Sequence, residues 1–326
     1  MDKIRMRTNA GSIKLRVTTK DGSPCELWND GKKIAELQSD NWENIAVQNN
    51  AEEIIIKGYD IQELDCCGSK LTALDISGLT SLKELYCYNN QLTSLAVSGL
   101  TSLQWLDCSD NQLTTLNVNG CTSLQWLDCE HNQLTALNAS GCTSLQELYC
   151  NNNQLTTLNV NGCTSLQWLD CYDNRLTALN VNGCTSLQWL DCSFNQLTAL
   201  DVSGLVNLED IDCCENGLTE LNVRNCRALQ RLNCSFNRLA ALDASGCTSL
   251  QKLYCNNNKL SAEDLKKIFE DLPERKEKCG RVLLYKDGDS KYKDFTQPPE
   301  LAAAFKAAKA KGWRLYKINN DDLMEL

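Results

Sequence analysis

The chain has 326 residues, of which 42% are hydrophobic and 23% are charged, and its formal net charge is -10. This composition is typical of a folded chain, and its acidic balance disfavours nucleic acid and anionic membranes as partners. The sequence contains no apolar run of about 18 residues, so no membrane span is expected.

Residues 1–60 predict a β-rich N-terminal cap. Short apolar runs alternate with polar residues, as in Ile13, Leu15 and Val17, and turn signals separate them. Trp28 and Trp42 are expected in the core of this cap. The N-terminus has no apolar stretch of the signal-peptide type, so a secreted form would require that a signal peptide had been removed.

Residues 61–260 contain a repeat with a period of 21 residues. One unit, residues 103–123, reads LQWLDCSDNQLTTLNVNGCTS. Three residues after the Cys of the strand segment stands Asn in nine units and Ser69 in the first. A second Cys recurs later in the unit and is replaced by Leu79, Leu100 and Leu205, which indicates a buried apolar site. The Cys of the strand segment occurs once in each unit, and we call this row of residues the first Cys ladder. Its members are Cys66, Cys87, Cys108, Cys129, Cys150, Cys171, Cys192, Cys213, Cys234 and Cys255.

The unit is too short to bury its own apolar face. In LQWLDC the alternation places Leu106 and Cys108 inward and Trp105 and Asp107 outward, as in a strand. Stacking of such units as parallel strands buries a continuous core. The Asn ladder is expected to satisfy main-chain groups where the chain leaves the strand, and the outer half of the unit is expected to form short extended or 3₁₀ segments.

The pattern LxxLxCxxNxL resembles the leucine-rich repeat, and the Cys at the strand position is similar to the cysteine-ladder internalins of Gram-positive bacteria. The segment Ala307 to Leu315, AAKAKGWRL, resembles a closing segment of Bacteroidetes leucine-rich surface proteins. The resemblance implies a right-handed leucine-rich repeat solenoid of the β/α type. It would have about ten repeats, a parallel concave sheet and caps at both ends.

Residues 261–326 predict an irregular α/β C-terminal cap. Ser261 is a suitable N-cap for a helix that buries Leu265, Ile268, Phe269 and Leu272. Trp313 is expected in the core. Further elements are a strand at 281–285, an Asp-Gly turn at 287–288, a helix at 300–311 and a strand at 313–318.

The ladder cysteines are expected to be buried free thiols. In-register neighbours lie about 4.8 Å apart, which exceeds the mean Cβ separation of a disulfide, about 3.8 Å. A linear ladder does not converge on a point, so no metal site and no cofactor are expected. Cys67 and Cys214 fall on the outward face, either without a role or with a redox or metal role.

The outward strand positions would form the concave face, where exposed aromatic residues are typical anchors of an interface. Beside four Trp runs a row of Asp whose like charges would gain from a cation, a basic partner or sugar hydroxyls. Recent duplication of near-identical units could equally have copied these residues without a binding role. The candidate site consists of Trp105, Trp126, Glu147, Trp168, Trp189, Asp107, Asp128, Tyr149, Asp170 and Asp191.

Signals for catalysis are poor. The chain has one histidine, His131, and lacks a nucleophile elbow, a P-loop and an HExxH motif. Pairs such as Glu147 with Asp128 or Asp170 resemble glycosidase carboxylates, but an open strand face offers no walled pocket. The sequence therefore predicts a non-enzymatic protein.

Three functions remain open: a module that binds a protein or peptide, possibly basic, a glycan-binding module, and a structural spacer without a ligand for this face. The family resemblance implies a bacterial, extracellular or cell-surface protein. The free thiols taken alone would suit the cytoplasm. A monomer is expected.

Overall fold

The computed structural model describes residues 1–47, 53–275, 280–286, 295–319 and 322–326. They form two compact units, Met1–Leu166 (unit 1) and Gln167–Leu326 (unit 2). This division falls inside the repeats and does not test the predicted boundaries at 60 and 260, which stay a prediction.

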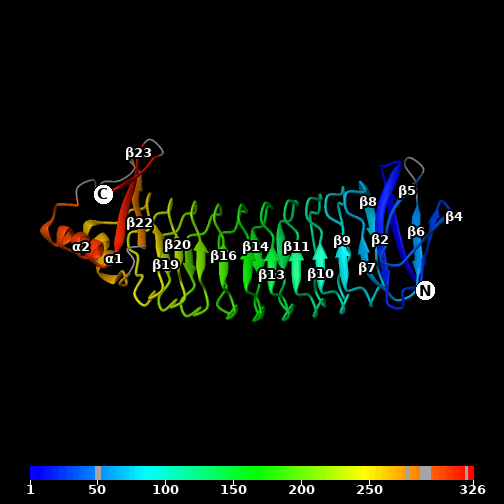
Figure 1. The fold of residues 1–326 in the computed structure, drawn as a ribbon, viewed down its shortest axis with the longest axis horizontal. Helices are drawn as coiled ribbons and strands as arrows, with labels where there is room; N and C mark the ends of the chain where they lie inside the picture. The colour runs from blue at the N-terminus through cyan, green and yellow to red at the C-terminus, as the bar shows by residue number, and fades with distance from the viewer. Residues whose placement is uncertain (48–52, 276–279, 287–294, 320–321) are drawn as a thin grey trace. The chain divides into compact units, whose positions relative to one another are not determined.

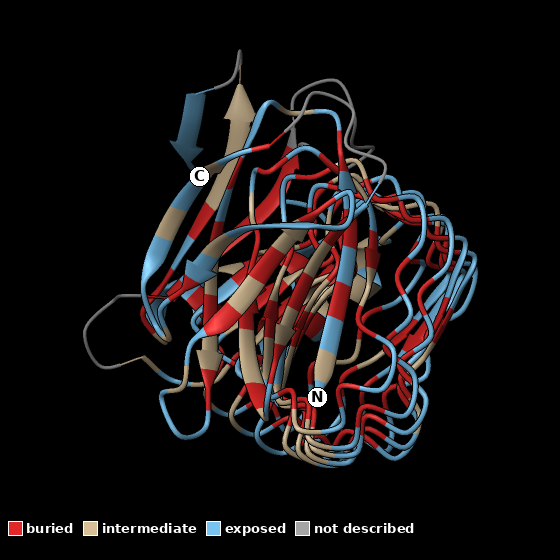
Figure 2. Cartoon of the chain, turned by 90° about the vertical axis from the view of Figure 1, so that its right-hand side faces the viewer, coloured by how far each residue is buried: buried red, intermediate tan, exposed pale blue. Residues whose placement is uncertain are grey.

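Unit 1 begins with antiparallel strands, as the alternating pattern of residues 1–60 predicts. Ile4, Met6, Ile13, Leu15 and Val17 alternate with exposed or half-buried residues and lie in the core (Figure 2). One sheet has the order β4-β3-β6-β1-β8, and a second begins with β5, β2 and β7. The strands are β1 (Asp2–Thr8), β2 (Ser12–Thr19), β3 (Cys25–Asn29), β4 (Lys32–Leu37), β5 (Trp42–Ala46), β6 (Ile54–Gly58), β7 (Ile61–Asp65) and β8 (Leu71–Asp75).

The prediction that Trp28 and Trp42 lie in the core is wrong. Trp42 is 43% exposed, and Trp28 is only half-buried. Both rings occupy outward strand positions, where they contact cations: Lys57 Nζ lies 3.7 Å from the Trp28 ring centroid, and Lys14 Nζ lies 4.3 Å from that of Trp42. The alternation that buries Leu15 and Leu27 turns these tryptophans outward.

The repeats form short parallel strands in register, as predicted (Figure 1). In unit 1 β7 is followed by β9 (Glu84–Tyr86), β10 (Trp105–Asp107), β11 (Trp126–Asp128) and β13 (Glu147–Tyr149). In unit 2 the corresponding strands are β15 (Trp168–Asp170), β16 (Trp189–Asp191), β18 (Asp210–Asp212), β20 (Arg231–Asn233) and β21 (Lys252–Tyr254). Each unit therefore contributes five of the ten predicted strands.

The outer half of the repeats is extended rather than helical. β12 (Ala136–Asn138) pairs in parallel with β14 (Thr157–Asn159) in unit 1, and β17 (Ala199–Asp201) pairs with β19 (Glu220–Asn222) in unit 2. The expected short extended segments are thus present.

The ladder cysteines are buried as predicted, but they do more than fill apolar space. The thiol of Cys108 donates to the Asp128 carbonyl oxygen of the next repeat at 3.4 Å. In the second ladder, Cys121 donates to Val97 O of the preceding repeat at 3.2 Å. Burial raises the pKa of the Cys108 thiol, so this thiol stays protonated and inert. Cys279 lies outside the described residues.

The Asn ladder ties neighbouring repeats together, as expected. Asn132 Oδ1 accepts from Leu113 N at 2.9 Å, and its amide donates to Cys108 O, Cys129 O and Glu130 O at 3.0–3.2 Å. One buried side chain therefore satisfies four main-chain groups in two repeats.

The last part of unit 2 confirms the predicted helices and strands. Ser261 caps the first helix in a capping box with Asp264, and Trp313 is buried. β21, β22 and β23 are parallel neighbours, and a strand that the sequence did not reveal, β24, pairs antiparallel with β23. The predicted turn at 287–288 lies outside the described residues. The elements are α1 (Ala262–Asp271), β22 (Gly280–Lys286), α2 (Pro299–Ala310), β23 (Trp313–Asn319) and β24 (Asp322–Glu325).

Candidate binding face on the parallel strands

The outward side chains of β9, β10, β11 and β13 form what we call the strand face of unit 1. Each strand buries its central residue, so the flanking residues point outward. In-register pairing aligns Trp105 with Trp126 and Trp126 with Glu147. The same pairing aligns Asp107 with Asp128 and Asp128 with Tyr149. Six of the ten predicted site residues are thus neighbours on one face.

Aromatic and acidic side chains contact one another on this face. The rings of Trp126 and Tyr149 lie 5.9 Å apart at an interplanar angle of 52°. The Tyr149 hydroxyl donates to Glu147 Oε2 at 2.8 Å. Trp105 is 36% exposed, so part of a large ring is accessible to a partner.

The Asp row, which the sequence suggests would gain from a cation or another partner, already has hydrogen bonds within the chain. Asp107 Oδ1 accepts from Ser109 N at 3.1 Å, and Asp128 Oδ1 accepts from Glu130 N at 3.0 Å. The chain turns directly after each strand, and the carboxylate caps the turn. Within the described residues, Oδ2 of both aspartates remains without a hydrogen bond. One oxygen of each aspartate therefore stabilises the fold, and the other can meet a ligand.

Burial makes these carboxylates costly to ionise. It raises the pKa of Asp128 to about 7, and the nearby charges of Asp107, Glu130 and Asp110 add to the effect. Burial also raises the pKa of Asp107, although hydrogen bonds from Ser109 oppose it. A cation placed here would relieve the repulsion among these groups.

The part of the sequence that forms the strand face of unit 1 has no positively charged side chain. Residues 84–166 contain six carboxylates and no Lys or Arg. At the N-terminal side of the sheet, by contrast, Arg16 pairs with Glu63 and lies 3.6 Å from Asp40. The six carboxylates are those of Glu84, Asp107, Asp110, Asp128, Glu130 and Glu147.

The four other predicted residues lie together in unit 2, where each has a contact on the face although Trp168 is still 37% exposed. Trp168 and Trp189 stack with their ring centroids 4.2 Å apart at an angle of 11°. Asp170 and Asp191 accept from the backbone N–H groups of Tyr172 and Ser193.

The predicted site did not include Arg231, which pairs with two aspartates of the acidic row of unit 2. It lies 2.8 Å from both Asp210 and Asp212. Register shows its position, but only the structure shows that it bridges two carboxylates.

Register places Glu130 and Asn151 on the outward face, but the predicted site did not include them. Asn151 is buried and its amide donates to Glu130 Oε2 at 2.8 Å. The lack of Lys and Arg around Glu130 is the sequence signal that could have identified it.

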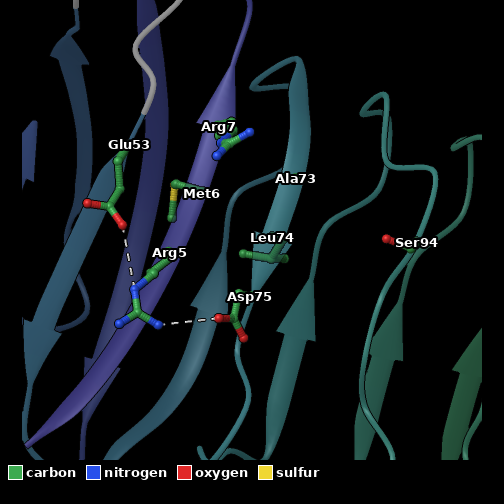
Figure 3. A pocket seen from close by; sticks show the side chains of 8 residues that line it. All are labelled: Arg5, Met6, Arg7, Glu53, Ala73, Leu74, Asp75 and Ser94. Atoms are coloured by element: carbon green, nitrogen blue, oxygen red, sulfur yellow. Dashed lines mark hydrogen bonds and ion pairs between the residues drawn. The ribbon is translucent and has the colours of Figure 1, made fainter. Parts of the chain in front are cut away.

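Unit 1 also has a cleft of about 340 Å³ beside β1 and β8 (Figure 3). Arg5 crosses it, with Nε 3.6 Å from Glu53 and Nη1 3.5 Å from Asp75. Both ion pairs are half-exposed, so they add little stability. The cleft lies on other strands than the strand face.

Neither a metal cluster nor a membrane-spanning helix occurs in the described part of the chain. No three His, Cys, Asp or Glu side chains there could hold a metal ion together. No helix among these residues is long and apolar enough to cross a bilayer.

Family comparisons match parts of the repeat array. "Leucine Rich repeats (2 copies)" matches residues 122–163 and 227–267, and "Leucine Rich Repeat" matches residues 102–124. None of the curated proteins compared with the chain matches it.

Solved structures share the architecture. YopM from Yersinia enterocolitica is 27% identical with a TM-score of 0.52, over 74% of this chain and 46% of that one. The TLR13–ssRNA13 complex is 20% identical with a TM-score of 0.53, over 76% and 41%. The functional domain of InlJ from Listeria monocytogenes, described as including a cysteine ladder, is 24% identical with a TM-score of 0.38, over 78% and 72%. The fold is a leucine-rich repeat solenoid, an architecture generally used for non-catalytic binding.

Proposed function

We propose that this chain is a non-catalytic module that binds a basic protein or peptide through the strand face of unit 1. The observation that carries the proposal is the coincidence of accessible tryptophans with six carboxylates in a stretch without Lys or Arg. A folded protein gains nothing from unbalanced charge of one sign on a sheet. A basic partner would compensate it.

The two residue types would contribute differently. Trp105 and Trp126 supply rigid apolar area, which is typical of interface hot spots. The carboxylates of Asp107, Asp128 and Glu130 would steer a basic partner and fix its register rather than supply most of the affinity.

The proposal also covers the caps at both ends of the array, the oligomeric state and the cellular location. Residues 1–60 and 261–326 would cap the array of residues 61–260, and the chain would act as a monomer at a bacterial cell surface. The internalin-like Cys pattern of the repeats and the likeness to YopM support a bacterial origin.

A structural role is the second candidate for the tryptophans of unit 2. Trp168 and Trp189 stack on each other, so each ring already has a partner. Stacked aromatic pairs stabilise a sheet by themselves. This pair therefore serves as a matched control for the unit 1 face.

The test is a binding screen of surface proteins, basic peptides and glycans against the full chain. We expect basic proteins or peptides to bind, and Trp105→Ala with Trp126→Ala to reduce affinity by about 2 kcal/mol or more. Trp168→Ala with Trp189→Ala should leave affinity within about 0.5 kcal/mol of wild type, because the proposed binding face does not include these two residues.

Other outcomes would contradict the proposal. Binders limited to neutral glycans, with affinity insensitive to salt, would favour the glycan alternative. The absence of any binder in all three collections would favour a spacer.

A further inference from the structure

One backbone position in every repeat adopts the left-handed conformation. It is the residue before the ladder Asn, or before Ser69 in the first repeat, and its φ lies between 49° and 62° in all ten repeats. Gly, Asn, Asp and His tolerate this conformation best, whereas a bulky residue there is an outlier.

Seven of the ten repeats follow this preference, and three consecutive repeats do not. The conforming residues are Gly68, Asn89, Asp110, His131, Asn152, Asp173 and Asn257. The exceptions are Phe194, Glu215 and Phe236, all in unit 2, with φ of 52°, 52° and 55°. Repeat duplication would have copied Asn or Asp into these places. Three departures side by side indicate a local gain that offsets the backbone cost.

Burial of the two phenylalanine rings does not offset the cost of the left-handed backbone conformation. Phe194 is 48% exposed and Phe236 is 39% exposed, so both rings keep much of their surface in solvent. Phe194 meets the edge of Tyr172, with ring centroids 5.4 Å apart. We call Phe194, Glu215 and Phe236 the Phe–Glu–Phe ridge.

The main chain holds the ridge in a fixed row. Phe194 N donates to Cys214 O and Phe236 N donates to Asn256 O, each at 3.0 Å, and Glu215 N donates to Ser235 O at 3.2 Å. Stacked repeats lie about 4.8 Å apart, so the two phenylalanines flank Glu215 at about 5 Å on either side.

The carboxylate of Glu215 has no ion-pair or hydrogen-bond partner in the described part of the chain. Aromatic rings on both sides of a free carboxylate suit a cationic side chain, which the carboxylate attracts and the ring faces stabilise. Arg175 and Arg238 are exposed two residues after Asp173 and Phe236. A cationic partner would be repelled by these two arginines. It would therefore approach Glu215 from the side of the strands, where Asp191 lies.

We propose that the Phe–Glu–Phe ridge is a second docking site, which takes an arginine or lysine side chain of a protein partner between Phe194 and Phe236 over Glu215. Apolar groups beside that cation would cover the two rings. Phe194 and Phe236 lie two repeats apart, about 10 Å. That span matches two turns of a helix, about 10.8 Å, so an amphipathic helix with a central cation fits the ridge.

The probe is a helical peptide with one arginine between leucines placed one turn before and one turn after it. Its matched counterpart carries glutamine in place of arginine. Fluorescence anisotropy with the full chain should show that the arginine peptide binds about tenfold more tightly, as expected for a cation held by rings and a carboxylate. Glu215→Gln should abolish this difference.

Two sets of variants separate the ridge from the fold and from the strand face of unit 1. The double variant Phe194→Asn with Phe236→Asn has the residue type of the other repeats at both positions. It should no longer bind the arginine peptide. Phe236→Asn alone should melt at or above the wild-type temperature, because it relieves an unfavourable backbone conformation. The double variant Trp105→Ala with Trp126→Ala should bind the arginine peptide with the wild-type affinity.

Three results would overturn the proposal: equal binding of the two peptides, retention of the arginine peptide by the double Asn variant, or loss of it with the Trp variant. A melting temperature several degrees lower for Phe236→Asn would also overturn it, because the ring would then be part of the scaffold. The proposed function of unit 1 does not depend on any of these outcomes.

Discussion

Asp128 illustrates at the scale of one residue how fold and binding share a side chain. One oxygen caps the turn after β11, and the other is left for a partner. Burial beside like charges raises its pKa to about 7. The residue therefore changes its charge close to neutral pH, and both stability and binding should depend on its protonation.

We predict that Asp128→Asn removes a pH-dependent loss of stability. Between about pH 4 and pH 7 the unfolded state releases this proton while the folded state retains it, so stability falls as pH rises. The amide oxygen that the substitution introduces would still accept the turn hydrogen bond. Urea unfolding should show a gain of roughly 1–3 kcal/mol for the variant at pH 8 and little change at pH 4. An equal gain at both pH values would contradict the raised pKa.

The Asn ladder leads to a second prediction at the residue scale. Asn132→Ala leaves the buried Leu113 N–H without an acceptor. It also removes one of the donors to each of three carbonyl oxygens, which keep a donor from Asn111, Asn153 or the main chain. A buried group without a partner costs about 1–3 kcal/mol, and each other lost hydrogen bond costs about 0.5–1.5 kcal/mol, so chemical denaturation should show a loss of about 2 kcal/mol or more.

The matched control for the ladder is Asn117, whose Oδ1 accepts only from Asn119 N on the exposed outer side. Asn117→Ala should cost about 1 kcal/mol or less, because water can replace the side chain. Similar losses for the two variants would contradict the role of the ladder.

At the scale of the structural element, the two Cys ladders differ in whether Leu replaces Cys. The first ladder is Cys in all ten repeats, whereas Leu79, Leu100 and Leu205 replace Cys in the second and remain buried. Both ladders donate to carbonyl oxygens of a neighbouring repeat. The first ladder sits directly after the strand, where neighbouring repeats are hydrogen-bonded and a larger side chain would separate them.

We predict that Cys108→Leu destabilises the protein by about 1–3 kcal/mol through overpacking, whereas Cys121→Leu costs less than about 1.5 kcal/mol. Urea unfolding of the two variants side by side provides the comparison. A larger loss for Cys121→Leu would contradict this account of the ladders.

At the scale of the whole molecule, periodicity explains why so much could be predicted. A phase of 21 residues sets the strand, its inward face and its neighbours together, so the repeats are where the sequence predicts them. Trp42 was misplaced because hydrophobicity alone does not distinguish a buried ring from one covered by Lys14 and Arg16. The turn-capping contacts of Asp107 and the bridging by Arg231 depend on side-chain conformation, which the repeat pattern does not encode.

Burial of the ladders makes a prediction for all the cysteines. Of the 19 described, Cys67 and Cys214 are the two that are not buried. We expect a thiol reagent to modify few cysteines of the native protein and all 20 of the sequence after denaturation without reductant. Fewer thiols after denaturation would reveal disulfides.

The central claim is that the acidic, aromatic strand face of unit 1 recognises a basic partner. The most direct measurement is the affinity of a basic partner from the screen at low and high salt, for wild type and for Trp105→Ala with Trp126→Ala. We predict that affinity falls with added salt and, for wild type, as pH drops below 7 and Asp128 is protonated. The Trp variant should bind about 2 kcal/mol more weakly with an unchanged melting temperature. Unchanged affinity with a melting temperature several degrees lower would contradict the claim and identify the tryptophans as scaffold.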